Sequence, residues 1–169
     1  MKDFQHPLEA LQDCHLRIEE RLGALERLVE HLANHGADAA AQSIAKDAVR
    51  YFDTAGTWHH QDEDEDLFPL LRALAAAQGR SEIAAAIEEL EREHGTMLGL
   101  WRALRASLER IAHGEVRLDT EQVTRFAWLY RRHMDRESAA VLPFATQALS
   151  PQNLAALGER MAARRRASR

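Results

Sequence analysis

The chain has 169 residues, including 8 Gly, 4 Pro and a single cysteine, Cys14. This length is typical of one domain, and so few chain-breaking residues favour long helices over a sandwich or a barrel. The formal net charge of −5 excludes a generally basic nucleic-acid binder, and one cysteine excludes an internal disulfide framework. No apolar run approaches the roughly 18 residues that span a membrane, and the first residues do not resemble a signal peptide. We therefore expect a cytoplasmic protein with no nucleic-acid partner and no membrane partner.

The first two predicted helices follow an apolar repeat with alternating spacings of three and four residues. One begins at Pro7 and ends at Asn34-His35-Gly36, because proline suits the first position of a helix and glycine its C-terminal end. The second carries the repeat from Ala45 to Leu67-Phe68-Pro69, where proline should kink or stop the helix.

Two further long helices follow the same pattern. A turn at Gln78-Gly79-Arg80 precedes the third, and Ser81 is its expected N-cap. This helix ends at His113-Gly114, and Asp119 or Thr120 is expected to cap the fourth.

The fourth predicted helix has an apolar seam that reaches Ala140 before Leu142-Pro143 interrupts it. A short fifth helix starts at Ser150-Pro151 and ends in the basic run 164–166. We interpret this run as favourable positive charge at a helix C-terminus. The acidic run 62–66 is either a solvated face or a segment that attracts cations towards the seams.

Short connections between four long helices predict an all-α, up-down-up-down four-helix bundle with a short fifth C-terminal helix. We expect the bundle domain to cover residues 1–149. Residues 150–169 would then form a C-terminal helical extension with a basic tail.

Six polar residues interrupt the apolar seams: His15, His59, Glu63, His94, His133 and Glu137. The pattern His-x3-Glu-x3-Leu-Phe-Pro at 59–69 is matched by His-x3-Glu-x3-Val-Leu-Pro at 133–143. A spacing of four places each histidine and its glutamate on one helix face. Folding the chain back at its predicted connections brings all six residues to one level of the bundle.

This combination of residue types predicts a site for two metal ions. The seams carry no Lys or Arg, so buried carboxylates there would need to be protonated or to bind a cation. Imidazole with carboxylate suits Fe, Mn or Zn, and carboxylate bridges hold two metals about 3.5–4 Å apart. The residues alone leave Fe, Mn and Zn open, and an oxo or hydroxo bridge can add a ligand to each ion.

Other residues near the seams receive weaker interpretations. Five histidines are predicted to lie off the seams, namely His6, His31, His35, His60 and His113. His60 and Asp62 flank the proposed ligands, either supporting them or lying solvated on the helix surface. Cys14 is expected to point away from the seam, and Tyr130 to belong to the core.

Four sequence motifs together resemble bacterial hemerythrin-like proteins of the HHE cation-binding family. They are Asp13-Cys14-His15, the segment His59-His60-Gln61-Asp62-Glu63 running into Leu67-Phe68-Pro69, Glu93-His94, and His133-x3-Glu137 running into Leu142-Pro143. The resemblance covers about residues 5–145. It implies a four-helix bundle around a non-haem di-iron centre, so we expect two Fe ions, with Mn or Zn as the less favoured metals.

The resemblance also implies a role for each of the six seam residues. His15 and His59 would ligate one iron, and His94 and His133 the other. Glu63 and Glu137 would bridge the two ions.

Two departures separate this chain from oxygen-carrying hemerythrins. Those proteins have a fifth histidine where this chain has Leu98, and an aspartate where it has Ser138. The set of four His and two Glu is more similar to di-iron proteins that repair iron–sulphur centres. Their short N-terminal cysteine-bearing domain has no counterpart in this sequence.

These features predict a non-haem di-iron protein that binds or responds to O2, NO or peroxide. The alternatives are iron storage or donation, iron-centre repair, and a peroxide-degrading or ferroxidase enzyme. The expected partner is a small diatomic molecule or peroxide. The sequence identifies the metal site better than the reaction.

Overall fold

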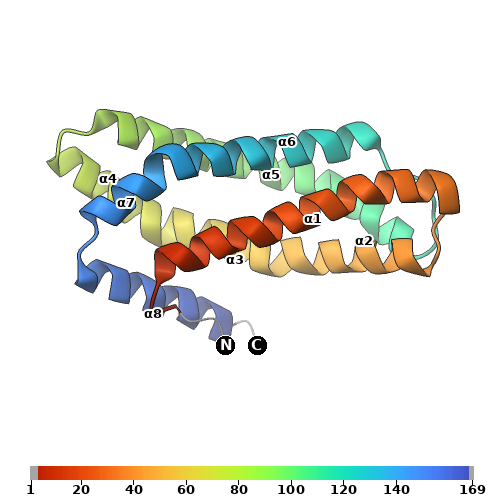
Figure 1. Cartoon of the computed structure of the whole chain (residues 1–169), viewed down its shortest axis with the longest axis horizontal. Helices are drawn as coiled ribbons and strands as arrows, with labels where there is room; N and C mark the ends of the chain where they lie inside the picture. The colour runs from red at the N-terminus through yellow and green to blue at the C-terminus, as the bar shows by residue number, and fades with distance from the viewer. Residues whose placement is uncertain (1–3, 168–169) are drawn as a thin grey trace.

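Residues 4–167 are described by a computed structural model, in which this part of the chain is helical and contains no strand. Four helical arms run antiparallel along the long axis, and a further helix closes the chain (Figure 1). The first arm is α1 (Pro7–His35), the third is α5 (Ser81–Ala112), and the C-terminal helix is α8 (Pro151–Ala167). The predicted all-α bundle with a short fifth C-terminal helix is confirmed.

The second and fourth arms are built from several helical segments each. The second contains α2 (Ala39–Tyr51), η1 (Phe52–Gly56), α3 (Thr57–Gln61), η2 (Asp62–Leu67) and α4 (Phe68–Ala77). The fourth contains α6 (Thr120–Arg136), η3 (Glu137–Val141) and α7 (Leu142–Ala148). The η segments are π-helical turns, whose hydrogen bonds span five residues instead of four. The N–H of Phe68 donates to the carbonyl of Glu63, and that of Leu142 to the carbonyl of Glu137.

Two prolines lie directly after these π turns. The sequence predicts that Pro69 kinks or stops its helix and that Pro143 interrupts its helix, because proline lacks an N–H and clashes with the preceding turn. The chain instead remains helical on both sides of each proline. The wider π turn accommodates the ring, so the expected breaks are local bulges. The extra residue also shifts the following side chains: Val141 is fully buried, whereas Ala140, predicted in the seam, is only half-buried.

Most predicted helix ends agree with the structure. Pro7 begins α1, and Gly36 ends it with a φ of 69°, a conformation that glycine adopts without strain. The carboxylate of Asp119 accepts a hydrogen bond from the N–H of Glu121 and caps α6. The predicted cap at Ser81 is wrong, since Ser81 is already the first helical residue and Arg80 precedes it without a side-chain cap.

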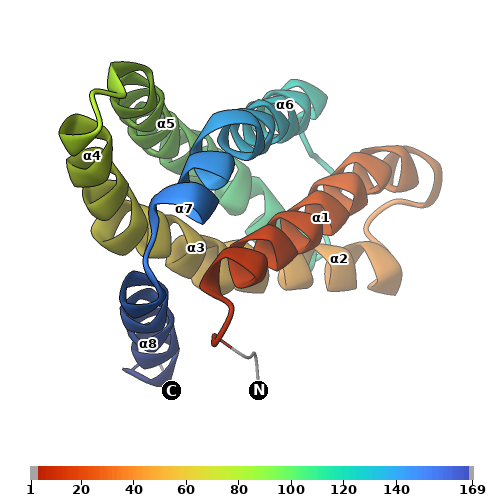
Figure 2. The same cartoon turned by 60° about the vertical axis from the view of Figure 1, so that its left-hand side comes forward.

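Two apolar clusters fill the bundle, one on each side of the polar level. The first includes Leu22, Trp101 and Phe126, and the second includes Phe68 and Ile87. The second cluster also contains Leu157 and Met161 of α8, so this helix contributes to the core. Figure 2 shows α8 beside the start of α1 and the second arm.

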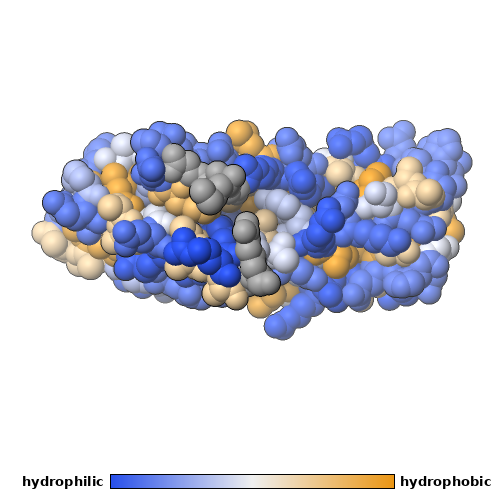
Figure 3. All heavy atoms as spheres, turned by 90° about the horizontal axis from the view of Figure 1, so that it is seen from below, coloured by the Kyte–Doolittle hydropathy of each residue, from blue (hydrophilic) through white to orange (hydrophobic). Residues whose placement is uncertain are grey.

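The surface on the α8 side is mostly hydrophilic, and apolar side chains form separate small areas there (Figure 3). None of the described helices has the length and apolar character that crossing a bilayer requires.

The contact between α8 and the N-terminal segment can be tested with two glycines. A Cβ at Gly158 would overlap the carbonyl oxygen of Phe4. A Cβ at Gly95, an exposed position of α5, would meet no atom within 4 Å. We expect Gly95→Ala to raise the free energy of unfolding by about 0.5–1 kcal/mol, because alanine favours helix. Gly158→Ala should lack this gain or destabilise the protein in urea unfolding. An equal gain in both variants would contradict the contact.

Candidate metal centre

The six polar seam residues lie together in the middle of the bundle. Each comes from a different segment: His15 from α1, His59 from α3, Glu63 from η2, His94 from α5, His133 from α6 and Glu137 from η3. All six are buried, with exposed fractions between 0% and 9%. The predicted convergence of these side chains is therefore what the structure shows.

Their donor atoms form two groups that share one carboxylate. His15, His59, Glu63 and Glu137 each offer an atom within 4.8 Å of the others, and so do Glu63, His94 and His133. One carboxylate oxygen of Glu63 lies 3.1 Å from Nε2 of His59, and the other lies 3.2 Å from Nε2 of His94.

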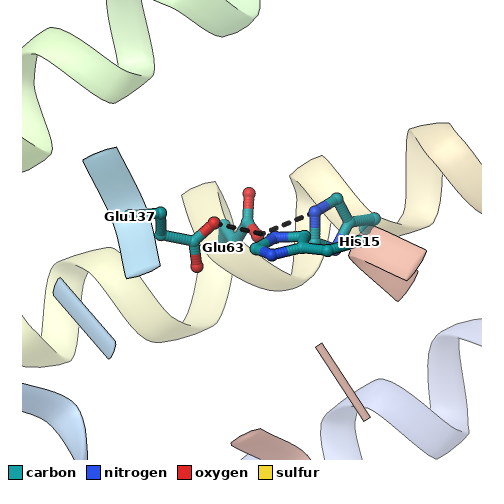
Figure 4. A group of neighbouring side chains, drawn as sticks. His15, Glu63 and Glu137 are labelled. Atoms are coloured by element: carbon teal, nitrogen blue, oxygen red, sulfur yellow. Dashed lines mark ion pairs between the residues drawn. The ribbon is translucent and has the colours of Figure 1, made fainter. Parts of the chain in front are cut away.

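Glu137 belongs to the first of these groups. Its Oε2 lies 3.0 Å from Nε2 of His15. Figure 4 shows these two side chains together with Glu63.

Most inner atoms of this cluster contact one another at 3.0–3.2 Å but make no well-aligned hydrogen bond within the described chain. Among the described residues, both carboxylate oxygens of Glu63 and of Glu137 make no hydrogen bond, and neither does Nε2 of His15 or His59. Buried polar atoms are nearly always hydrogen-bonded in folded proteins, so such a group of exceptions needs an explanation. Burial and the neighbouring Glu137 carboxylate both raise the pKa of Glu63. A bound cation would pair with these atoms, so the residues present fit a metal centre.

Two further carboxylates contact the outer sides of the imidazole rings. Nδ1 of His94 lies 2.8 Å from Asp64, and Nδ1 of His133 lies 3.2 Å from Glu93. Although burial alone lowers the pKa of His94, Asp64 and Glu63 raise it to about 10. Metal binding at His94 would therefore displace a proton. Sequence reasoning missed both contacts, although Glu93 stands beside His94 and Asp64 beside Glu63.

Two arginines hold Glu93 in place. Its Oε1 accepts hydrogen bonds from Arg132 at 2.7 Å and from Arg136 at 3.0 Å. Burial opposes ionisation, but the hydrogen bonds from His133 and Arg132 lower the pKa of Glu93 to about 2. Glu93 is therefore a fixed anion beside His133.

His60 contradicts its predicted place off the seams. Its ring stacks on that of His94, with centroids 4.0 Å apart, and lies 5.6 Å from the ring of Tyr130. The short segment α3 that carries His60 lies between two π turns, η1 and η2. His60 is therefore packed among the inner rings, and Tyr130, 4% exposed, is a core residue as predicted.

The acidic run is not simply a solvated face. Asp62 is fully buried and pairs with Arg164 and, at 2.6 Å, with Arg165 of α8. Asp66, 9% exposed, pairs with Arg164 and Arg160, each at 2.8 Å. The basic run therefore makes specific ion pairs with the segment that carries Glu63, beyond its expected role as charge at a helix end.

Cys14, which was predicted to point away from the seam, is nevertheless buried. Only 2% of the residue is exposed. Burial raises the pKa of its thiol to about 11, so Cys14 is a protonated, buried side chain at neutral pH.

Comparison with known proteins gives two matches. A family model for the hemerythrin HHE cation-binding domain matches residues 6–145, a range that includes all six seam residues and ends before α8. An uncharacterised protein of Haemophilus influenzae is 31% identical over 163 residues, which cover 96% of this chain and 91% of that protein.

The ion pairs of α8 can be tested by comparing two neighbouring arginines. Arg165→Ala leaves buried Asp62 with Arg164 as its arginine partner, so we expect the free energy of unfolding to fall by about 2 kcal/mol. Arg166 is exposed and has no ion pair within the described chain, so Arg166→Ala is the matched control. Urea unfolding of both variants measures the difference. Equal stabilities would show that the Arg165 contact contributes little.

Proposed function

The chain belongs to the hemerythrin HHE cation-binding family, and from this premise we propose that it is a non-haem di-iron protein that binds O2, NO or peroxide. The position of Glu63 carries the proposal. Its two oxygens face His59 and His94, which belong to different groups of donor atoms. A carboxylate shared between two sets of imidazoles is an arrangement that suits two adjacent metal ions.

We assign the ligands in two sets. His15 and His59 hold one ion, His94 and His133 hold the other, and Glu63 bridges them. Glu137 lies with the first set and, as the resemblance implies, serves as the second bridge.

The donor set and its burial favour a small exogenous ligand. Imidazole and carboxylate suit iron, and about four protein donors per ion leave a coordination position open. Bound iron would supply the redox chemistry that O2, NO and peroxide require. The ligand residues are at most 9% exposed and lie between two apolar clusters, which favours a small ligand over a large organic substrate.

The position of Leu98 bears on reversible oxygen transport. Leu98 stands where oxygen-carrying hemerythrins have a fifth histidine, and it is 49% exposed. An exposed leucine supplies no metal ligand. The proposal therefore covers binding of a small oxidant or NO, and it does not extend to reversible oxygen transport.

Metal stoichiometry and optical spectra test the proposal. After anaerobic loading with ferrous iron, we expect close to two iron atoms per chain and new absorption bands on separate addition of O2, NO or peroxide. One metal atom or none after loading would refute the two-ion centre. Two atoms with no spectral response to any of the three molecules would favour iron storage or donation.

Substitutions separate the ligands from neighbouring histidines. Glu63→Ala should lose both ions, because Glu63 is proposed to link them. His59→Ala should lose metal, whereas His60→Ala should retain most of it. His31→Ala is the surface control, since His31 pairs with Asp38 on the connection between α1 and α2. Metal analysis measures each variant, and metal loss in His60→Ala without loss in His59→Ala would overturn the assignment of His59.

Removing the metal should lower the melting temperature. Ligands that bind only the folded chain add their binding free energy to its stability. Without metal, the buried carboxylates of Glu63 and Glu137 also keep only their contacts with neighbouring imidazoles. Calorimetry of loaded and metal-free protein measures the shift, and identical melting temperatures would place any bound metal outside the core.

A further inference from the structure

We infer, on the basis of the proposed function, that the two metal positions differ in metal affinity. Asp64 and Glu93 make the His94–His133 position bind its ion more tightly than the His15–His59 position. Asp64 and Glu93 then act as positioning residues, because each contacts a histidine ligand and is not itself a ligand.

The outer nitrogens of His94 and His133 have carboxylate acceptors. A histidine that binds metal through Nε2 carries its proton on Nδ1, and an acceptor at Nδ1 fixes both the tautomer and the ring. Asp64 lies 2.8 Å from Nδ1 of His94, and Glu93 lies 3.2 Å from Nδ1 of His133. Both Nε2 atoms point inward, 3.1 Å from each other. These two rings are therefore oriented for a metal before it arrives.

The rings of the other position lack this support. Nδ1 of His59 is buried and has no hydrogen-bond partner among the described residues. When Nε2 of His59 binds metal, the N–H on Nδ1 would remain buried and unpaired, which is unfavourable. The carboxylate contacts recorded for His15 and His59 in the described chain are made by Nε2, on the inner side.

The carboxylate of Glu93, which contacts His133, is itself fixed in position. Arg132 and Arg136 both donate to Oε1, which leaves Oε2 for His133. The same arginines also pair with Glu89, which is half-exposed and has no recorded contact with His133. Glu89 is therefore a control with the same charge and the same arginine partners.

Timed removal of metal tests the inference. The full chain is loaded with ferrous iron under anaerobic conditions, two ions per chain are verified, and release to excess EDTA is followed. Wild type should release one ion quickly and one slowly. Glu93→Gln should speed the slow phase about tenfold, as expected when a support of a histidine ligand is lost, and leave the fast phase unchanged. Glu89→Gln should match wild type in both phases.

Asp64→Asn provides a second test if Glu93→Gln does not fold, as judged by circular dichroism. The Asp64 side chain is 38% exposed, so its replacement disturbs the core little. It should also speed the slow phase, with Glu65→Gln, in the same acidic run, as its control.

Two results would overturn the inference: a single release phase for both ions in wild type, or equal effects of Glu93→Gln and Glu89→Gln. Fewer than two ions bound before EDTA is added would refute the proposed di-iron function instead, and the inference with it.

Discussion

The burial of two carboxylates, Glu63 and Glu137, is the constraint on which the rest of the structure depends. Both are fully buried, and their oxygens make no hydrogen bond within the described chain. Four inward imidazoles and two apolar clusters surround them, and no lysine or arginine of the described chain pairs with either carboxylate. A cation bound by imidazole and carboxylate would satisfy these atoms, and this explains why so polar a layer exists inside a helical bundle.

The same two glutamates mark where the helices depart from α geometry. Each contributes the carbonyl that accepts the five-residue hydrogen bond of a π turn, from Phe68 or from Leu142. A proline then follows, Pro69 or Pro143, as the second residue of the next α segment. Because the motif occurs twice, the ligand glutamate, the π turn and the proline form one repeated unit. The wider turn accommodates the proline ring, while the spacing of four from the preceding histidine places the glutamate side chain inward.

The sequence was sufficient for the bundle and for the convergence of the six polar side chains, because both depend on helical periodicity and short connections. It was not sufficient where a π turn changes the period. Ala140 was misplaced for this reason, since it lies within the π turn η3. His60 was misplaced although His59 beside it was not, because its ring stacks on that of His94, a contact that helical periodicity does not indicate. Asp62 was misplaced for another reason: its burial depends on Arg164 and Arg165, about a hundred residues later, which no local pattern indicates.

The carboxylates of the acidic run 62–66 face two groups of partners, the imidazoles of the proposed metal centre and the arginines of α8. Glu63 faces the imidazoles on the inside, and Asp64 contacts the outer nitrogen of His94. Asp62 and Asp66 face the arginines of α8, which lies outside the range matched to the family. Because the arginines neutralise the outer carboxylates whether or not metal is bound, the inner carboxylates remain the ones that depend on a cation. Because the arginines of α8 pair with Asp62 and Asp66, these carboxylates can be buried beside the proposed metal centre without competing for its ions.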